Sequence, residues 1–220
     1  MGNRPLLDLA LERLHGLDVA VNTHHLASQV VEHLHDTEVH VAVEPGEALG
    51  TAGGVAHLRP WIDGRHVEIT NGDAWLDADL ADLRTTWDRS TVRLAVVEDL
   101  ERPDFDGRWR FAGVSLMPWD AVARLPNGVS GLYEEVWAPA RRAGSLELID
   151  VGGRFVDCGT PGAYWQANML WSGGESVVHP TATVAGDVVR SVLWPHAEVK
   201  PGERLVDAIR LPDGRTVSID

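Results

Sequence analysis

The α/β pattern of this chain is clearest in Glu38-Val-His-Val-Ala-Val-Glu44-Pro-Gly-Glu-Ala-Leu49-Gly-Thr-Ala-Gly-Gly54. Residues 38–43 alternate as a strand does, a glycine-rich loop follows, and a helix is predicted near 52–59. A further strand at 66–70 ends in Asn71-Gly72-Asp73. Strands that alternate with helices indicate a largely parallel sheet covered on both faces, whose ligands bind beyond the carboxyl ends of the strands. The glycine loop and Asp73 are both expected at such ends.

The same alternation extends in both directions from this stretch. Apolar spacing predicts helices at 5–15, 24–35, 79–87, 119–125, 131–143 and 160–171, and strands at 17–22, 91–97, 108–117, 146–150 and 154–157. We therefore predict a Rossmann-like α/β/α sandwich over residues 1–172. Doubly wound domains normally open with a strand, whereas this chain opens with a helix, so the first strand and its loop are expected to be missing or to come from elsewhere.

The pattern changes from about residue 176. Apolar residues recur there at intervals near six, with small residues between them, and helical periodicity disappears; the recurring residues are Val178, Val184, Val192, Val199, Leu205 and Ile209. Such repeats predict two or three coils of a parallel β-helix over residues 176–220. Because a short β-helix has exposed ends, we expect homo-oligomers to form through this tail.

Composition bounds the class of protein. With 220 residues, 44 % hydrophobic and 24 % charged, the chain fits one sizeable soluble domain with a small appendage. No run approaches the roughly 18 apolar residues of a membrane span, and no signal-peptide pattern opens the chain, so a cytoplasmic location is expected. The single cysteine, Cys158, excludes an internal disulfide and a cysteine zinc cluster, and it fits a reducing compartment.

The charge balance restricts the partners. There are 19 basic and 33 acidic residues, a net charge of −14, which argues against a surface for nucleic acid or anionic lipid. The only lysine is Lys200, and the other basic residues are arginines. A polyphosphate ligand would thus depend on arginines, backbone amides, helix N-termini or a metal ion for positive charge.

Two features could carry chemistry. The loop around Gly50 and Gly53 precedes a helix, where free amides favour an anion, although a glycine turn that only lets a helix and a strand pack is an equally good interpretation. Asp73 and Asp157 each end a predicted strand, and two such aspartates can jointly hold a hard cation such as Mg²⁺. Taken singly, each aspartate is more often a turn former.

Six segments, in this order and at these separations, resemble the sugar-1-phosphate nucleotidyltransferases. The segments are Arg4-Pro-Leu-Leu-Asp-Leu-Ala-Leu-Glu-Arg-Leu14, Val19-Ala-Val-Asn22, Glu44 through Leu49-Gly-Thr-Ala-Gly-Gly54, Thr70-Asn-Gly-Asp73, Phe111-Ala-Gly113 and Val156-Asp-Cys-Gly-Thr-Pro161. The likeness is greatest to mannose-1-phosphate guanylyltransferase-like proteins and N-acetylmuramate-1-phosphate uridylyltransferases, over about residues 3–171. The tail is similar to the left-handed β-helix of many guanylyltransferase-like members.

The resemblance implies a reaction in which a sugar 1-phosphate and a nucleoside triphosphate give a nucleotide-sugar and pyrophosphate. It also implies roles by position: Asp73 and Asp157 as the catalytic residues that hold Mg²⁺, Gly50, Thr51, Gly53 and Asn71 against the nucleotide, and Gly113 beside the sugar.

The chain also departs from the family pattern. The family's first strand, its Gly-x-Gly-x-Arg loop, the Pro-Lys pair and a Glu-Lys-Pro segment near the sugar have no counterpart here, and Arg102 is the candidate substitute for the last of these. One hypothesis is an enzyme whose sequence is given from a late start codon or as a fragment, with weak turnover of the chain as given. Another is a catalytically inactive nucleotide-sugar-binding or regulatory homologue. A third, less favoured, is a hexapeptide-type acyltransferase that uses His179 or His196.

Overall fold

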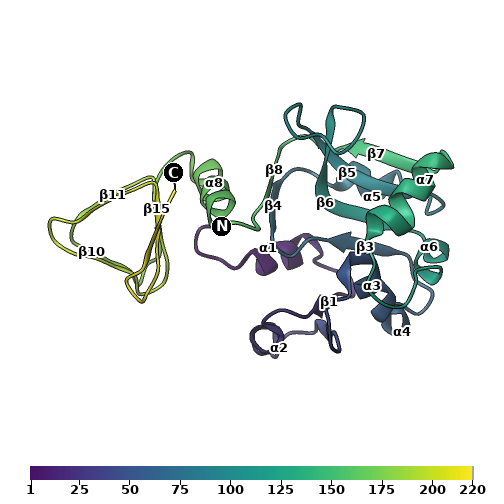
Figure 1. Cartoon of the computed structure of the whole chain (residues 1–220), viewed down its shortest axis with the longest axis horizontal. Helices are drawn as coiled ribbons and strands as arrows, with labels where there is room; N and C mark the ends of the chain where they lie inside the picture. Colours follow the sequence, from purple (N-terminus) through teal and green to yellow (C-terminus); the bar gives the residue numbers. More distant parts are fainter. Residues whose placement is uncertain (220) are drawn as a thin grey trace. The chain divides into compact units, whose positions relative to one another are not determined.

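The computed structural model describes residues 1–219, which divide into two compact units. The sheet unit comprises residues Leu14–Thr70 and Ala78–Gly153. The tail unit comprises Met1–Arg13, Asn71–Asp77 and the described residues from Arg154 onward. Figure 1 draws both units with their element labels.

The sheet unit contains a four-stranded sheet in the order β3 (Val67–Thr70), β6 (Trp109–Met117), β5 (Val92–Glu98), β7 (Leu146–Asp150). β5 pairs with β7 in parallel, but β3 and β5 both pair with β6 antiparallel. A separate parallel pair is formed by β1 (Ala20–Thr23) and β2 (His40–Val43). The expected largely parallel sheet is therefore wrong. β5 and β6 pair antiparallel because a short loop connects them, whereas parallel neighbours require a longer crossover, usually a helix.

The helices of the sheet unit are α2 (Ala27–Leu34), α3 (Gly50–His57), α4 (Arg59–Ile62), α5 (Ala81–Thr85), α6 (Trp119–Ala123) and α7 (Ala138–Arg142). The helix predicted at 131–143 is divided into a π-helical turn, η1 (Tyr133–Trp137), and α7. The core of the unit forms around Leu94, Val96, Met117 and Val122, which are fully buried. β5 is buried at every residue except Glu98, and its apolar run Leu94–Val97 is typical of a central strand.

The tail unit begins with α1 (Leu6–Arg13) and contains the antiparallel pair β4 (Ala74–Asp77) and β8 (Arg154–Asp157). α8 (Pro161–Ser172) follows β8. Thr160 caps α8 by accepting a hydrogen bond from the Ala163 amide, and Gly173 ends it in the left-handed region with φ 69°. Met1, Trp75, Val156 and Ala167 form the buried cluster between these elements.

The rest of the tail unit is a stack of short parallel strands, drawn as three-sided coils in Figure 1. The first coil consists of β9 (Val177–Val178), β10 (Thr183–Val184) and β11 (Asp187–Val189), and the second of β12 (Val192–Leu193), β13 (Glu198–Val199) and β14 (Arg204–Val206). Each strand of the first coil pairs in parallel with its counterpart in the second. β15 (Ala208–Arg210) starts a third turn, and β16 (Thr216–Ser218) pairs with it antiparallel.

Among residues 1–219, none of the helices has both the length and the apolar character that a bilayer crossing needs. The longest, α8, has 12 residues.

Candidate functional site

The β4–β8 ladder brings the two predicted metal ligands to neighbouring positions. Ala74 stands opposite Asp157, and the Cys158 amide donates to the Asp73 carbonyl oxygen at 3.2 Å. Ladder spacing places the Asp73 and Asp157 Cα atoms about 6 Å apart. Asp157 ends β8 as predicted, whereas Asp73 lies in the turn before β4 rather than at the end of the strand before it.

Cross-strand contacts fix this ladder at its other end. Asp77 stands opposite Arg154, and their side chains form an ion pair at 2.7 Å. The Arg154 guanidinium also lies over the Trp75 ring, 5.2 Å from its centroid. Trp75 itself is buried, so the strand that directly follows Asp73 is anchored by an apolar side chain.

Both aspartates are exposed, and their surroundings leave oxygen atoms open to a ligand. One carboxylate oxygen of Asp157 accepts from the Gly159 amide at 3.2 Å. Within the described residues, the Asp73 carboxylate has no hydrogen bond or ion pair. Burial is the main cause that raises the pKa of the Cys158 thiol to about 11, and the charges of Asp157 and Asp73 add to it. The Cys158 thiol is therefore protonated at neutral pH in the metal-free chain.

The donor set fits Mg²⁺. Magnesium is held by hard oxygen ligands, typically one or two carboxylates together with waters and substrate phosphates. Asp73 and Asp157 supply two such carboxylates. In the part of the chain that the structure describes, no three or more His, Cys, Asp and Glu residues gather as a metal cage. The rest of the coordination shell would then come from substrate and water.

The glycine loop is engaged in packing contacts within the sheet unit. The Ala52 and Gly53 amides donate to the Ser130 carbonyl at 3.0 and 3.4 Å, and the Thr51 hydroxyl accepts from the Leu132 amide at 3.0 Å. A Cβ at Gly53 would meet the Gly128 carbonyl oxygen closer than the 3.0 Å that Cβ contacts essentially never show. These contacts favour the interpretation that the glycines let α3 pack, and the nucleotide role of Gly50, Thr51 and Gly53 stays a prediction.

The buried carboxylate of Glu44 supports this loop, and Glu44 was not among the site residues predicted from the sequence. Glu44 follows β2, is 8 % exposed, and accepts hydrogen bonds from the Leu49 amide at 2.7 Å and from the Asn22 side-chain amide. The Asn22 amide oxygen is buried and has no partner among residues 1–219. The sequence contains one signal for such a role: an acidic residue directly follows a predicted strand, and α/β sheets bind ligands beyond the carboxyl ends of their strands.

The remaining predicted residues are dispersed along the chain. Asn71 lies in the three-residue link between β3 and β4. Gly113 is buried in β6 with φ 78°, where the register against β5 shifts between Leu94 and Val96, so a bulge requires its conformation. Arg102 is exposed in the loop before β6, and its backbone amide donates to Asp99 at 2.9 Å. The roles predicted for Asn71, Gly113 and Arg102 stay predictions.

Many arginines are committed to ion pairs within the protein. Those with a carboxylate partner are Arg4, Arg65, Arg84, Arg93, Arg108, Arg110, Arg141, Arg154, Arg190, Arg210 and Arg215. The supply of positive charge for a polyphosphate is correspondingly small, which increases the importance of a divalent cation.

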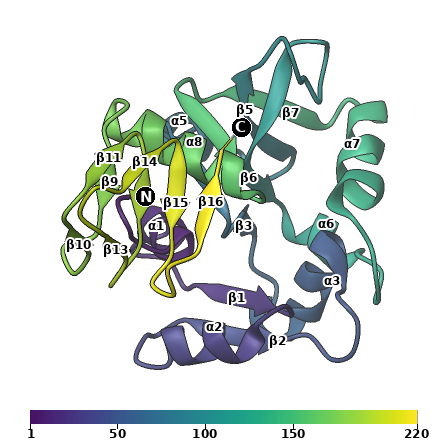
Figure 2. The same cartoon turned by 60° about the vertical axis from the view of Figure 1, so that its left-hand side comes forward.

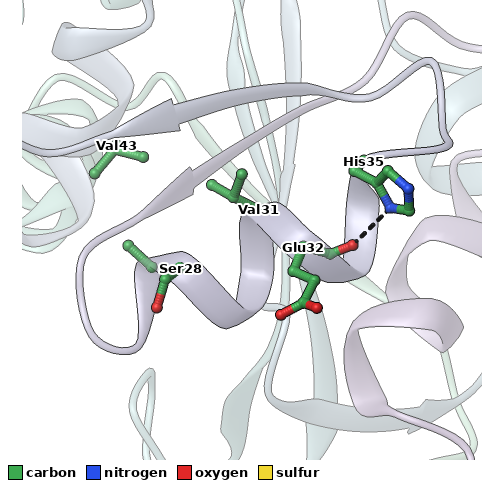
Figure 3. A pocket seen from close by; sticks show the side chains of 6 residues that line it. Ser28, Val31, Glu32, His35 and Val43 are labelled. Atoms are coloured by element: carbon green, nitrogen blue, oxygen red, sulfur yellow. Dashed lines mark hydrogen bonds between the residues drawn. The ribbon is translucent and has the colours of Figure 1, made fainter.

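A pocket lies between α2 and β2, as Figure 3 shows. It is lined by Ala27, Ser28, Val31, Glu32, His35 and Val43. The His35 ring is hydrogen-bonded to the Glu32 backbone oxygen at 2.9 Å, so one of its few polar groups is already paired. None of the predicted site residues lines this pocket, and we assign no function to it.

Comparison with known proteins identifies the fold. No protein-family model and no curated protein sequence matches the chain. A structure described as mannose-1-phosphate geranyltransferase from Thermus thermophilus is similar with a TM-score of 0.67 and 15 % identity, over 97 % of this chain and 84 % of that chain. HddC from Yersinia pseudotuberculosis, complexed with GMP-PN, is similar with a TM-score of 0.59 and 17 % identity, over 76 % of this chain and 84 % of that chain.

The inositol-1-phosphate CTP transferase from T. maritima is similar with a TM-score of 0.56 and 16 % identity, over 74 % of this chain and 80 % of that chain. At these identities the likeness shows the fold alone. The resemblance to sugar-1-phosphate nucleotidyltransferases that the six segments predict is thereby confirmed at the level of the fold, which is a mixed α/β fold.

Proposed function

We propose that this chain transfers a nucleotidyl group from a nucleoside triphosphate to a sugar 1-phosphate, giving a nucleotide-sugar and pyrophosphate. The observation that carries the proposal is that the exposed Asp73, in the turn directly before β4, lies beside the exposed Asp157, which ends β8 in the β4–β8 ladder. The fold supports it, since a similar structure is an inositol-1-phosphate CTP transferase by name.

In this reaction a phosphate oxygen of the sugar 1-phosphate attacks the α-phosphorus. A new oxygen–phosphorus bond forms, the bond between the α-phosphorus and the bridging oxygen breaks, and its electron pair leaves with pyrophosphate. Mg²⁺ would supply positive charge to the α-phosphate and the leaving group. Asp73 and Asp157 would hold that ion and fix its position, while Gly50, Thr51, Gly53 and Asn71 contact the nucleotide and Gly113 borders the sugar.

The expected rate of nucleotidyl transfer depends on how many hydrogen-bond donors and cationic side chains are free to stabilise the transition state. The Ala52 and Gly53 amides already donate to the Ser130 carbonyl, and many arginines are paired with carboxylates. Electrostatic stabilisation of the developing charge is usually the largest catalytic contribution, and each missing donor costs roughly 2–4 kcal/mol. We therefore expect slow turnover that depends strongly on the cation held by Asp73 and Asp157.

The same observations favour one alternative, a nucleotide-sugar-binding homologue that does not turn over. A site with two carboxylates and a cation, but few cationic side chains, can bind a nucleotide without stabilising the transition state. The two candidates share the Asp73–Asp157 pair and differ only in whether product forms.

A single-turnover assay separates the candidates. The full chain is mixed with Mg²⁺, a nucleoside triphosphate labelled at the α-phosphate and a panel of hexose 1-phosphates. The Asp73→Asn variant is run beside it, with Asp77→Asn, at the end of β4, as the control. Labelled nucleotide-sugar that requires Asp73 but not Asp77 supports transfer. Nucleotide binding without product supports the binding homologue, and the absence of both would overturn both proposals.

The proposal extends to the tail. We propose that residues 176–219 wind in the left-handed sense and that copies of the chain associate through them. The parallel pairing of successive coils supports a β-helix. Association between copies is expected because such stacks leave unpaired strand edges at their ends.

A further inference from the structure

A second pocket lies within the tail unit, and we call it the α1–α8 pocket after two of the elements that line it. Both helices are labelled in Figure 2. The pocket has a volume of about 320 Å³. Its lining residues come from the start of the chain, α1, β4 and α8: Met1, Arg4, Leu9, Glu12, Arg13, Trp75, Leu76 and Trp171. Sites for small molecules begin at about 300 Å³, so this pocket has room for a compact ligand.

The deepest residues of the α1–α8 pocket are apolar. Met1, Trp75 and Leu76 are buried, and Leu9 packs against the cluster that contains Met1 and Trp75. An apolar lining of this kind favours a ligand with an apolar body, because the contact removes hydrocarbon surface from water.

Trp171 adds an exposed aromatic wall. It is 53 % exposed, whereas Trp75 in the same pocket is 5 % exposed. The outer edge of the Trp171 ring lies against Gly2, where a Cβ would come within 2.7 Å of its Cη2 atom. Gly2 is fixed in turn, since its amide donates to Oδ1 of the fully buried Asn168 at 3.3 Å. A large ring that is exposed and also held at one edge offers a surface on which a flat ligand ring can stack.

The charged residues of the α1–α8 pocket favour an anion. Arg4 and Arg13 line it together with a single carboxylate, Glu12, although the whole chain carries −14. Arg4 and Glu12 form an ion pair in which the two side chains are 49 and 58 % exposed. Exposed ion pairs contribute little to stability, so Arg4 can exchange Glu12 for the anionic group of a ligand. A guanidinium binds carboxylate and phosphate oxygens with two parallel hydrogen bonds.

We propose that the α1–α8 pocket binds a small anion built on a flat ring. The ring stacks on Trp171, and Arg4 and Arg13 bind the phosphate or carboxylate group. The fold creates this combination, because the arginines, the apolar lining and the aromatic wall come from segments that are far apart in the sequence. The inference goes beyond nucleotidyl transfer and does not depend on it, since neither Asp73 nor Asp157 lines the pocket.

Titration calorimetry of the full chain in EDTA tests the inference, because without a divalent cation the proposed metal site is not formed. The probes are the four common nucleoside 5′-monophosphates, indole-3-acetate as a ring with a carboxylate, and ribose 5-phosphate as an anion without an aromatic ring. We expect at least one ring-bearing anion to bind with a dissociation constant of roughly 10 µM to 1 mM. Ribose 5-phosphate should bind at least about tenfold more weakly, because it cannot stack.

Two variants of the lining residues test the contacts. Trp171→Leu and Arg4→Met should each weaken binding at least about tenfold, whereas Trp171→Phe, which keeps a ring, should restore most of the affinity. Arg215→Met is the matched control, because Arg215 belongs to the same unit, has an exposed ion pair with Asp213 and does not line the pocket. It should bind like the wild type, and melting curves of all variants verify folding.

The tighter class of probe identifies the anionic group, and either a nucleotide or indole-3-acetate supports the inference. No binding of any ring-bearing anion up to about 5 mM would overturn it. Equal binding of ribose 5-phosphate, or binding that Trp171→Leu and Arg4→Met both leave unchanged, would overturn it as well. Because these titrations contain no divalent cation, their failure would leave the proposed nucleotidyl transfer standing.

Discussion

Replacement of Gly53 by alanine tests what the glycine loop does. The new Cβ would meet the Gly128 carbonyl oxygen well inside the 3.4 Å at which ordinary contact begins. The Gly128 segment cannot retreat freely, because the Ser130 carbonyl accepts hydrogen bonds from the Ala52 and Gly53 amides. We expect a loss of about 2–3 kcal/mol in the free energy of unfolding, as for overpacked cores, and a melting temperature lower by about 4–12 °C.

Thermal unfolding followed by circular dichroism, without nucleotide, measures this loss against two graded variants. Gly54→Ala places its Cβ 2.5 Å from the Asn22 side-chain nitrogen, which can move, so about 1 kcal/mol is expected. Gly162→Ala, on α8, has no atom within 4 Å and should be neutral or slightly stabilising. If Gly53→Ala melts like Gly162→Ala and loses only nucleotide binding, the packing interpretation is refuted.

Other predictions follow from buried polar groups. Burial raises the pKa of the Tyr164 hydroxyl above its ordinary value of 10.0, so the unfolded chain loses this proton first and the free energy of unfolding should fall as pH rises through and above about 10. Tyr164→Phe should flatten that part of a series of melting temperatures from about pH 8 to 11. An unchanged slope would contradict this prediction. Arg93→Met removes a guanidinium that is 7 % exposed and should cost about 3 kcal/mol in urea unfolding, whereas Arg108→Met, from an exposed pair, should cost under about 1 kcal/mol; equal costs would refute the ranking. Thr51→Val leaves a backbone amide without its acceptor and should cost about 1–2 kcal/mol without ligand, a loss that would be absent if the hydroxyl served only the nucleotide.

Local signals made most elements predictable. The strand predicted at 91–97 forms as β5, and α8 begins and ends where Thr160, Pro161 and Gly173 indicate. These features depend on neighbouring residues only, so a single sequence contains them. The glycine-rich loop leads into α3 for the same reason.

Pairing was less predictable because it depends on residues far apart. β4 has four residues after a turn, and only its partner β8, about 80 positions later, defines it as a strand. The parallel sheet was expected from alternation alone, and the alternation fails between β5 and β6, where a loop allows antiparallel pairing.

The candidate site contains one feature that the sequence predicts and one that depends on residues far away in the sequence. Two aspartates at predicted strand ends indicated a common site, and the ladder does bring Asp73 and Asp157 to neighbouring positions. The glycines of α3 could not be separated from a ligand loop by sequence, since their neighbours Gly128 and Ser130 lie more than 70 residues away.

The most direct test of the central claim is the affinity of the full chain for magnesium–nucleoside triphosphate complexes, measured by titration calorimetry with all four common bases. Removal of one charge-assisted contact is worth about 1.5–3 kcal/mol, so Asp73→Asn and Asp157→Asn should each weaken binding of the preferred nucleotide about ten- to a hundredfold. The double variant should lose less than the sum, because both residues act through one ion. Asp77→Asn, at the far end of β4, should bind normally. Unchanged affinity in both single variants, with Mg²⁺ present, would contradict the claim that Asp73 and Asp157 hold the metal of this protein.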